Sequence, residues 1–201
     1  MKKIQKFIEI WKSAIMQPAK TFSSERRNAD FKEGAWHVGL AGVITGFIAG
    51  LVALLFGTAV GGAIGSTIGI AAFVMGIVLT PIISVIMWLI GSGIIYIVAK
   101  LLGGKGDFKL QSYLFAIYMA PISIISTIIG VIPVVNMLGI VVTLYSLYLL
   151  TLAIKESHRF TTMKAVITWL IPAVLLMIVV LVLGAAFLAG LGLGGLSNLG
   201  I

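Results

Sequence analysis

The chain has 201 residues, of which 60% are hydrophobic and 10% charged, and its mean hydropathy is +1.19. A soluble globular domain carries about 25% charged residues, so this composition excludes a soluble domain and indicates an integral membrane protein. The formal net charge is +8, and no cysteine is present, which excludes disulfide, thiolate and iron–sulfur chemistry.

Residues 1–35 form the one long stretch compatible with water, and they begin with the pattern of a basic amphipathic helix. Its apolar positions recur every three or four residues: Ile4, Phe7, Ile8, Trp11 and Ile15. We expect this helix to end before Pro18 and to lie along the membrane surface, where basic residues such as Lys12 are attracted to anionic lipid. Packing on the helix bundle and binding of a partner remain open as alternatives.

The uncharged run over residues 36–99 is too long for one membrane crossing, because a helix needs about 20 residues to cross the hydrocarbon core. The small-residue segment 57–69 is the expected turn, since glycine costs about 1 kcal/mol relative to alanine inside a helix. A glycine-rich tail over residues 190–201 is expected to be loose. The sequence thus predicts an all-α polytopic membrane bundle within residues 36–189, with five transmembrane helices near 36–57, 70–99, 112–130, 136–154 and 166–189.

The distribution of basic residues predicts the orientation. With five spans, residues 1–35 and the connections 100–111 and 155–165 lie on one face and hold all 14 Lys and Arg residues. A six-span alternative, which divides the 36–99 run near Pro81, would place basic residues on both faces. Because Lys and Arg concentrate in cytoplasmic loops, we expect five spans, a cytoplasmic N-terminus and an external C-terminus, with Pro81 as a kink in the second span.

Several short elements, in order along these spans, resemble the Yip1 family of five-span membrane proteins. They are Pro18-Ala19-Lys20-Thr21-Phe22, the GGKGDFK turn at 103–109, Ala120-Pro121, Lys155-Glu156-x-His158 and Thr161-x-x-Lys164-Ala165. The resemblance covers about residues 17–172. The long acidic arm of eukaryotic relatives does not occur in this sequence, so it resembles the compact prokaryotic form. The resemblance implies a protein of a prokaryotic cell membrane without established catalytic activity.

The sequence offers few candidates for catalytic, metal-binding or ion-transporting residues. Asp, Glu, Lys and Arg are absent from the predicted spans, which disfavours ion-coupled transport. His37, at the edge of the first span, and His158, in a loop, are expected to be interfacial rather than metal ligands. The sequence contains neither H-E-x-x-H nor G-x-S-x-G, and its GGKG element lacks the spacing of a phosphate-binding loop. We expect no enzyme activity, no cofactor and no metal site, and we expect Asp107 and Glu156 to balance nearby lysines.

Two patterns of spacing occur within the membrane. Glycines that recur every four residues let helices approach closely, so we expect packing within the bundle, with a homo-oligomer formed through the first span as the alternative. The candidate packing positions are Gly42, Gly46, Gly50, Gly61 and Gly65. A polar stripe on the second span would line a cavity if its serines do not bond to helix carbonyls. This candidate stripe comprises Ser84, Trp88, Ser92 and Tyr96.

Candidate contacts to membrane lipids or to an unidentified protein partner are on the predicted cytoplasmic side. They are Phe7, Trp11, Lys12, Lys105, Lys109, Lys155, Arg159 and Lys164. Nucleic acid is not expected, because the charge is spread around a membrane rim. Two function hypotheses follow: a non-enzymatic organiser of membrane, lipid or protein partners that acts through its cytoplasmic face, and a small channel or transporter for an uncharged or lipid-like solute.

Overall fold

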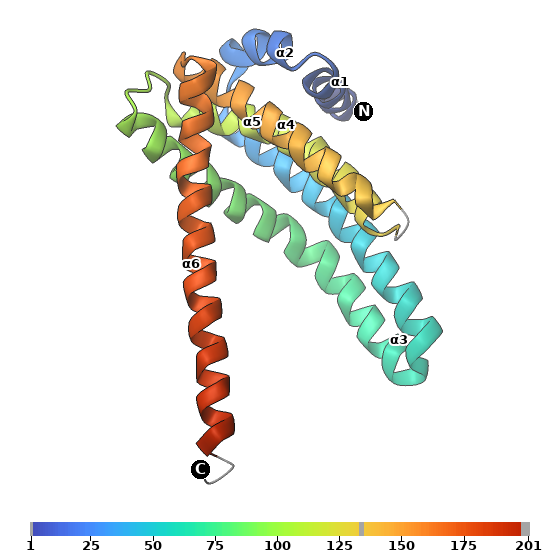
Figure 1. The fold of residues 1–201 in the computed structure, drawn as a ribbon. Helices are drawn as coiled ribbons and strands as arrows, with labels where there is room; N and C mark the ends of the chain where they lie inside the picture. The colour runs from blue at the N-terminus through green and yellow to red at the C-terminus, as the bar shows by residue number, and fades with distance from the viewer. Residues whose placement is uncertain (1, 133–134, 198–201) are drawn as a thin grey trace.

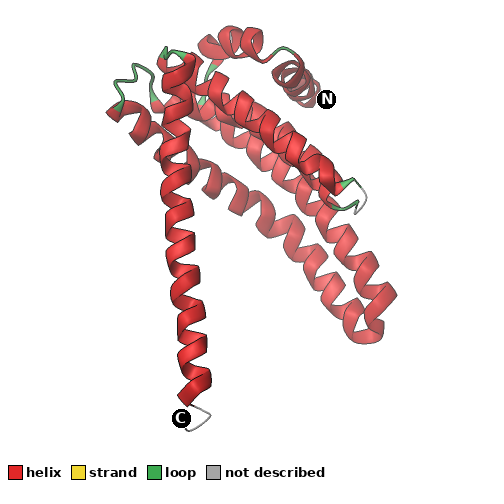
Figure 2. Cartoon of the chain, in the orientation of Figure 1, coloured by secondary structure: helices red, strands yellow, loops and turns green. Residues whose placement is uncertain are grey.

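The computed structural model describes residues 2–132 and 135–197, which form helices and short connections with no strand (Figure 2). The helices are α1 (Lys2–Met16), α2 (Pro18–Glu25), α3 (Phe31–Leu101), α4 (Phe108–Gly130), α5 (Gly139–His158) and α6 (Thr162–Ser197), with 3-10 turns at Arg26–Asn28 and Asn136–Leu138. Within the described residues, five segments are long and apolar enough to cross a membrane: Phe31–Ala59, Gly61–Leu101, Phe108–Gly130, Gly139–His158 and Thr162–Phe187. The predicted all-α, five-span class is therefore confirmed.

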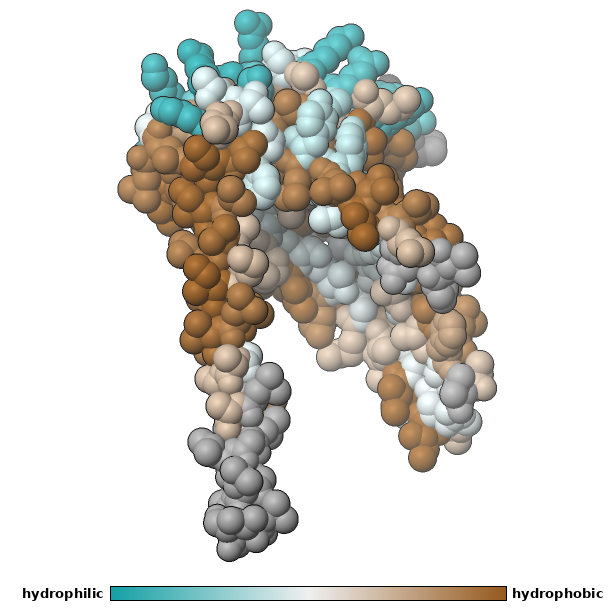
Figure 3. All heavy atoms as spheres, in the orientation of Figure 1, coloured by the Kyte–Doolittle hydropathy of each residue, from teal (hydrophilic) through white to brown (hydrophobic). Residues whose placement is uncertain are grey.

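The helices define two different ends of the molecule. Figure 1 shows α1 and α2 lying across one end, α3 folded back on itself, and α6 diverging from the other helices; α4 packs against α3, and α5 packs against α4. Figure 3 shows hydrophilic side chains gathered at the end that carries α1 and α2, and apolar side chains over the helices below it. We call this hydrophilic end the polar end.

The turn between the first and second spans is much tighter than the expected 57–69 loop. α3 is helical on both sides of Gly62, whose φ of 56° and ψ of −140° lie in a region that glycine adopts readily. Gly57 and Gly65 stay helical because they lie at the contact between the two arms, where a Cβ on Gly57 would be 2.5 Å from the Gly65 carbonyl oxygen. Close approach of the arms outweighs the helix-propensity cost on which the loop prediction was based.

The limits predicted for three other helices also differ from those observed. α4 begins at Phe108 rather than 112, because the Asp107 carboxylate accepts a 2.6 Å hydrogen bond from the Leu110 N–H and caps the helix. α5 continues to His158, and Arg159 follows it in the left-handed region with φ 55°. α6 runs over Thr162–Ser197, so the expected loose tail is helical up to residue 197, and its last residues, 198–201, lie outside the described residues.

The core lies close to the polar end, where α4 contacts α1, α3 and α5. The largest fully buried apolar side chains are Trp88, Phe22, Leu114, Ile117, Leu149 and Ile154. The lower parts of α6 and of the second arm of α3 expose apolar side chains instead, which suits contact with hydrocarbon. Hence the polar end is the rigidly packed part of the molecule.

Candidate interaction site at the polar end

The amphipathic helix α1 is packed on the bundle. Phe7 and Trp11 are 4% and 8% exposed and lie on the side of α1 that faces α4, whereas Ile4 and Ile8 are each 55% exposed. The apolar face expected for this helix is therefore divided between two environments. Phe7 and Trp11, candidate lipid contacts in the sequence, are mostly covered by protein, whereas the apolar side chains of Ile4, Ile8 and Met16 are exposed, as is Lys12.

A buried histidine holds α1 in place. The Trp11 Nε1–H donates a 2.8 Å hydrogen bond to His37 Nδ1, and the Phe7 ring centroid is 4.1 Å from the His37 ring centroid. His37 is 1% exposed and is therefore covered by protein, while its expected position at the level of the membrane interface stays a prediction. The apolar spacing of α1 indicated that Trp11 lies on the apolar face of this helix. No pattern in the sequence indicated that Trp11 contacts His37, which lies 26 positions away.

α2 is attached through one apolar and two polar contacts. The Phe22 side chain is fully buried, with its ring centroid 6.3 Å from that of Tyr118. The Arg26 guanidinium lies 3.0 Å from the Glu156 carboxylate and donates to the Glu156 carbonyl at 2.9 Å. Glu156 thus pairs with an arginine of the N-terminal segment and not, as expected, with a nearby lysine. The Tyr113 hydroxyl also donates a 2.8 Å hydrogen bond to the Glu25 carboxylate.

His158 connects three helices and the α3–α4 turn (residues 102–107). The Gly106 N–H donates to His158 Nδ1 at 3.3 Å, so Nε2 carries the proton and donates to the Gln111 Oε1 at 2.7 Å. Gln111 Nε2 in turn donates to the Ser92 carbonyl at 2.7 Å. His158 and Gln111 are 1% and 0% exposed. His158 is the last residue of α5, so the prediction that it lies in a loop is wrong.

The glycines of the GGKGDFK turn make room for this histidine. A Cβ on Gly104 would clash with His158 Nδ1 and lie 2.8 Å from the Ala99 carbonyl oxygen, and one on Gly106 would clash with the Ser157 carbonyl. Gly103 has φ 83°, which favours glycine. Asp107 caps α4 through its carboxylate. Gly104 and Gly106 thus allow the α3–α4 turn to contact the C-terminal end of α5 closely.

The expected cavity stripe lies mostly in packed protein. Trp88 and Ser92 are each 1% exposed, and the Trp88 Nε1–H donates to the Ser112 carbonyl at 2.9 Å. Tyr96 packs against Phe108 and His158, with ring centroids 5.5 and 5.9 Å apart. Ser84 is partly buried and, with Trp88, lines a pocket of about 230 Å³ between α3 and α4. The stripe is therefore packed against protein at Ser92 and Tyr96, and it borders a pocket at Ser84 and Trp88.

The candidate packing glycines mostly lie between the two arms of α3. A Cβ on Gly42 would be 2.5 Å from Pro81 Cα, and one on Gly50 would be 2.9 Å from Phe73 Cα. Added Cβ atoms on Gly46 and Gly65 would clash with the carbonyl oxygens of Gly76 and Gly57, whereas one on Gly61 would meet no atom within 4 Å. The glycine face of the first span is thus occupied by the second arm.

The α3–α4 and α5–α6 connections lie at the polar end (Figure 1). The basic candidates in or next to these connections are all exposed: Lys105, Lys109, Lys155, Arg159 and Lys164. We call these five residues the basic rim. Lys155 Nζ donates to the Thr162 hydroxyl at 3.2 Å, and Lys164 Nζ lies 5.7 Å from the centroid of the Phe160 ring. The rim therefore presents cations above the membrane-spanning helices.

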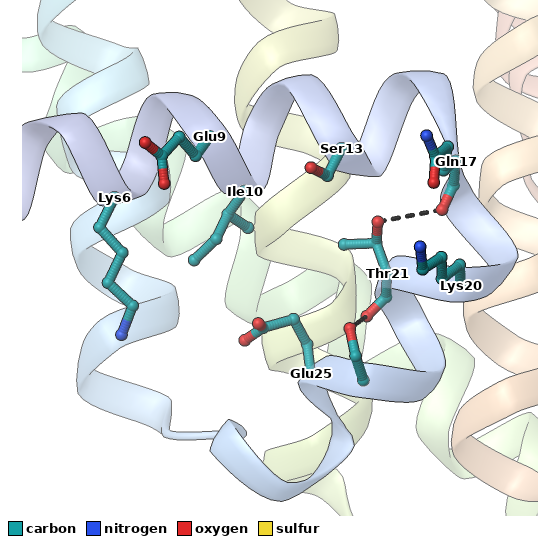
Figure 4. A pocket seen from close by; sticks show the side chains of 9 residues that line it. Lys6, Glu9, Ile10, Ser13, Gln17, Lys20, Thr21 and Glu25 are labelled. Carbon is teal, nitrogen blue, oxygen red and sulfur yellow. Dashed lines mark hydrogen bonds between the residues drawn. The ribbon is translucent and has the colours of Figure 1, made fainter.

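A polar groove between α1 and α2 was not anticipated from the sequence. It has a volume of about 370 Å³ and contains side chains of both charges, as Figure 4 shows: Lys6, Glu9, Lys20 and Glu25. The Thr21 hydroxyl donates to the Gln17 carbonyl at 3.0 Å and stabilises its wall. Over the described ranges 2–132 and 135–197, no group of three or more His, Cys, Asp or Glu side chains is placed to hold a metal ion.

Comparison with known proteins agrees with these observations. A family model described as the Yip1 domain matches residues 12–184. Neither a curated protein nor a solved structure matches the chain. The matched region contains all five candidate membrane spans up to residue 184 and the elements that meet at the polar end, namely Phe22, the 103–109 turn and His158. The chain is an integral membrane protein that belongs to the Yip1 domain family.

Proposed function

We propose that this protein is a non-enzymatic organiser of the membrane, which gathers anionic lipids or an acidic protein partner at its polar end. The observation that carries the proposal is the attachment of α1 and α2 to the bundle. Trp11 bonds to His37, Phe22 is buried, and Arg26 pairs with Glu156, so the N-terminal segment is a fixed part of the polar end. A fixed surface can hold a partner without the entropic cost of ordering a loose segment.

The basic rim supplies the attraction. Its five cations are exposed, and a basic residue near an anionic leaflet contributes about 1 kcal/mol to association. The chain holds 14 basic residues against 6 acidic ones, and all of the basic ones lie within residues 1–35, in the α3–α4 and α5–α6 connections, or in the helical turns next to these connections. We therefore place the polar end in the cytoplasm of a prokaryotic cell, in accordance with the positive-inside rule.

The test replaces the five rim residues by glutamine in the full chain, reconstituted in vesicles that contain equal amounts of phosphatidylglycerol and phosphatidylcholine. We expect the wild-type protein to be enriched in phosphatidylglycerol neighbours, measured with spin-labelled lipids, and the rim variant to lose most of that enrichment. A matched control replaces Arg27 and Lys20, two exposed basic residues outside the rim, and should keep it. Equal lipid contacts and equal cross-linked partners in the rim variant and the control would refute the proposal.

A further inference from the structure

Two apolar grooves lie side by side where the first arm of α3 enters the membrane. One has a volume of about 510 Å³ and runs between α1 and the first arm, where Ile4, Phe7 and Val43 line it. The other has a volume of about 480 Å³ and runs between the two arms, where Ile82 and Ile86 line it. Both grooves also share the same three lining residues, Trp36, Gly39 and Pro81.

The shape of this surface depends on one missing side chain. A Cβ on Gly39 would meet only the Val85 Cγ2, at 3.9 Å, so the space beside this glycine is open. Trp36, three residues earlier, is 54% exposed and projects where the two grooves adjoin. The exposed indole of Trp36 therefore lies between two apolar grooves, which meet at the open space over Gly39.

A cation lies at one end of the paired grooves. Lys32 is exposed, precedes Trp36 by one helical turn and lines the groove between the arms. It comes one residue after the start of the first membrane-spanning segment, Phe31–Ala59, so it belongs to the boundary between headgroups and hydrocarbon. Tryptophan is enriched at this boundary, and a lysine there extends its ammonium group toward the headgroups.

We infer that the paired grooves bind one anionic diacyl phospholipid from the leaflet at the polar end. One acyl chain lies in each groove, on either side of Trp36, and the phosphate lies beside Lys32. Two adjacent apolar grooves, one of which is lined by Lys32 near the headgroup boundary, match the chemistry of two chains joined to one anion. This inference rests on the proposed function, and it names a particular site for the lipid that the basic rim attracts less specifically.

The test uses the full chain in nanodiscs of equal phosphatidylglycerol and phosphatidylcholine, extracted in mild detergent, with retained lipids counted per protein by mass spectrometry. Gly39→Leu places a side chain in both grooves and should remove about one retained phospholipid. Gly91→Leu is the matched control, because a Cβ on Gly91 meets no atom within 4 Å on the same helix. Lys32→Gln should keep the number of phospholipids and lower the preference for phosphatidylglycerol about fivefold, while Arg27→Gln should leave both unchanged.

The outcomes separate this site from the rim. If Gly39→Leu and Gly91→Leu retain equal amounts of lipid, the site is refuted. It is refuted as well if the grooves hold another occupant, seen as a dimer or as a co-purified protein that Gly39→Leu releases. A loss of phosphatidylglycerol in the rim variant but not in Lys32→Gln refutes the site and leaves the proposed function standing. A loss in Lys32→Gln but not in the rim variant supports the site and refutes the rim as the attracting surface.

Discussion

The Trp11 indole donates a 2.8 Å hydrogen bond to His37 Nδ1, and this bond joins the N-terminal helix to the first membrane-spanning helix across 26 residues. Both side chains are at least nine-tenths buried, so the bond forms away from water. It makes α1 part of the packed core at the polar end rather than a separate surface helix.

Replacing Trp11 by phenylalanine should therefore loosen α1. The variant keeps an aromatic ring but removes the donor to His37 Nδ1, and loss of a buried hydrogen-bond partner costs about 1–3 kcal/mol. Hydrogen exchange of the α1 amides in detergent should become faster, while α4 amides stay protected. Lys12→Gln, at the next and exposed position, is the control. Equal exchange in the two variants would show that the bond does not hold the helix.

A second prediction concerns the turn that encloses His158. Gly104→Ala should destabilise the protein, because the added Cβ clashes with His158 Nδ1 and crowds the Ala99 carbonyl. Clashes of this kind in a packed site typically cost about 1–3 kcal/mol. Gly91→Ala introduces the same methyl group in open space and should be neutral or slightly stabilising. Thermal unfolding in detergent compares the two, and an unchanged midpoint for Gly104→Ala would contradict the role given to the turn.

The turn also shows what the sequence could and could not reveal. Hydropathy and length were sufficient for five helices and for the class of protein, because crossing a membrane constrains both strongly. His158 and Gln111 are 47 positions apart, and their 2.7 Å hydrogen bond is set by tertiary packing that no local pattern encodes. The sequence contains the glycines at 104 and 106, but it does not show that they contact His158, which belongs to another helix.

The α3 hairpin gives a prediction with a clear alternative. Gly46→Ala places a Cβ against the Gly76 carbonyl, so the two arms must separate and the unfolding temperature should fall. The oligomeric mass should stay the same, because the face is used within the chain. Gly93→Ala, on the second arm where an added Cβ meets no atom within 4 Å, is the control. A change of mass with unchanged stability would instead assign Gly46 to contacts between chains.

The turn of this hairpin is shorter than the predicted one for a related reason. Glycine has a low helix propensity, and a run of small residues at 57–69 was interpreted as a loop on that basis. In a membrane, the same residues allow two helices to touch along their backbones, as Gly57 and Gly65 do. Only Gly62 departs from helical geometry, and its positive φ could not be distinguished in sequence from the other glycines around it.

The ion pair between Arg26 and Glu156 should contribute little by itself. The side chains are 28% and 29% exposed, and pairs in contact with water are typically worth about 0.2–1 kcal/mol. A double-mutant cycle with Arg26→Gln and Glu156→Gln should give a coupling energy in this range, measured by unfolding in detergent and lower at high salt. Because Arg26 also donates to the Glu156 carbonyl, Arg26→Gln should cost more than Glu156→Gln. Equal costs would show that the carbonyl contact is without effect.

The last prediction tests the orientation on which the proposed function depends. The chain has no cysteine, so single cysteines can be introduced at Lys105 and Arg159 on the polar end and at Gly61 at the opposite tip of the α3 hairpin. All three positions are exposed, and a Cβ at Gly61 meets no atom within 4 Å. In intact cells, an impermeant thiol reagent should label Gly61→Cys alone, whereas in inverted vesicles it should label Lys105→Cys and Arg159→Cys, because lysine and arginine stay on the cytoplasmic side. Labelling of Lys105→Cys in intact cells would place the basic rim outside, where the anionic cytoplasmic leaflet cannot attract it.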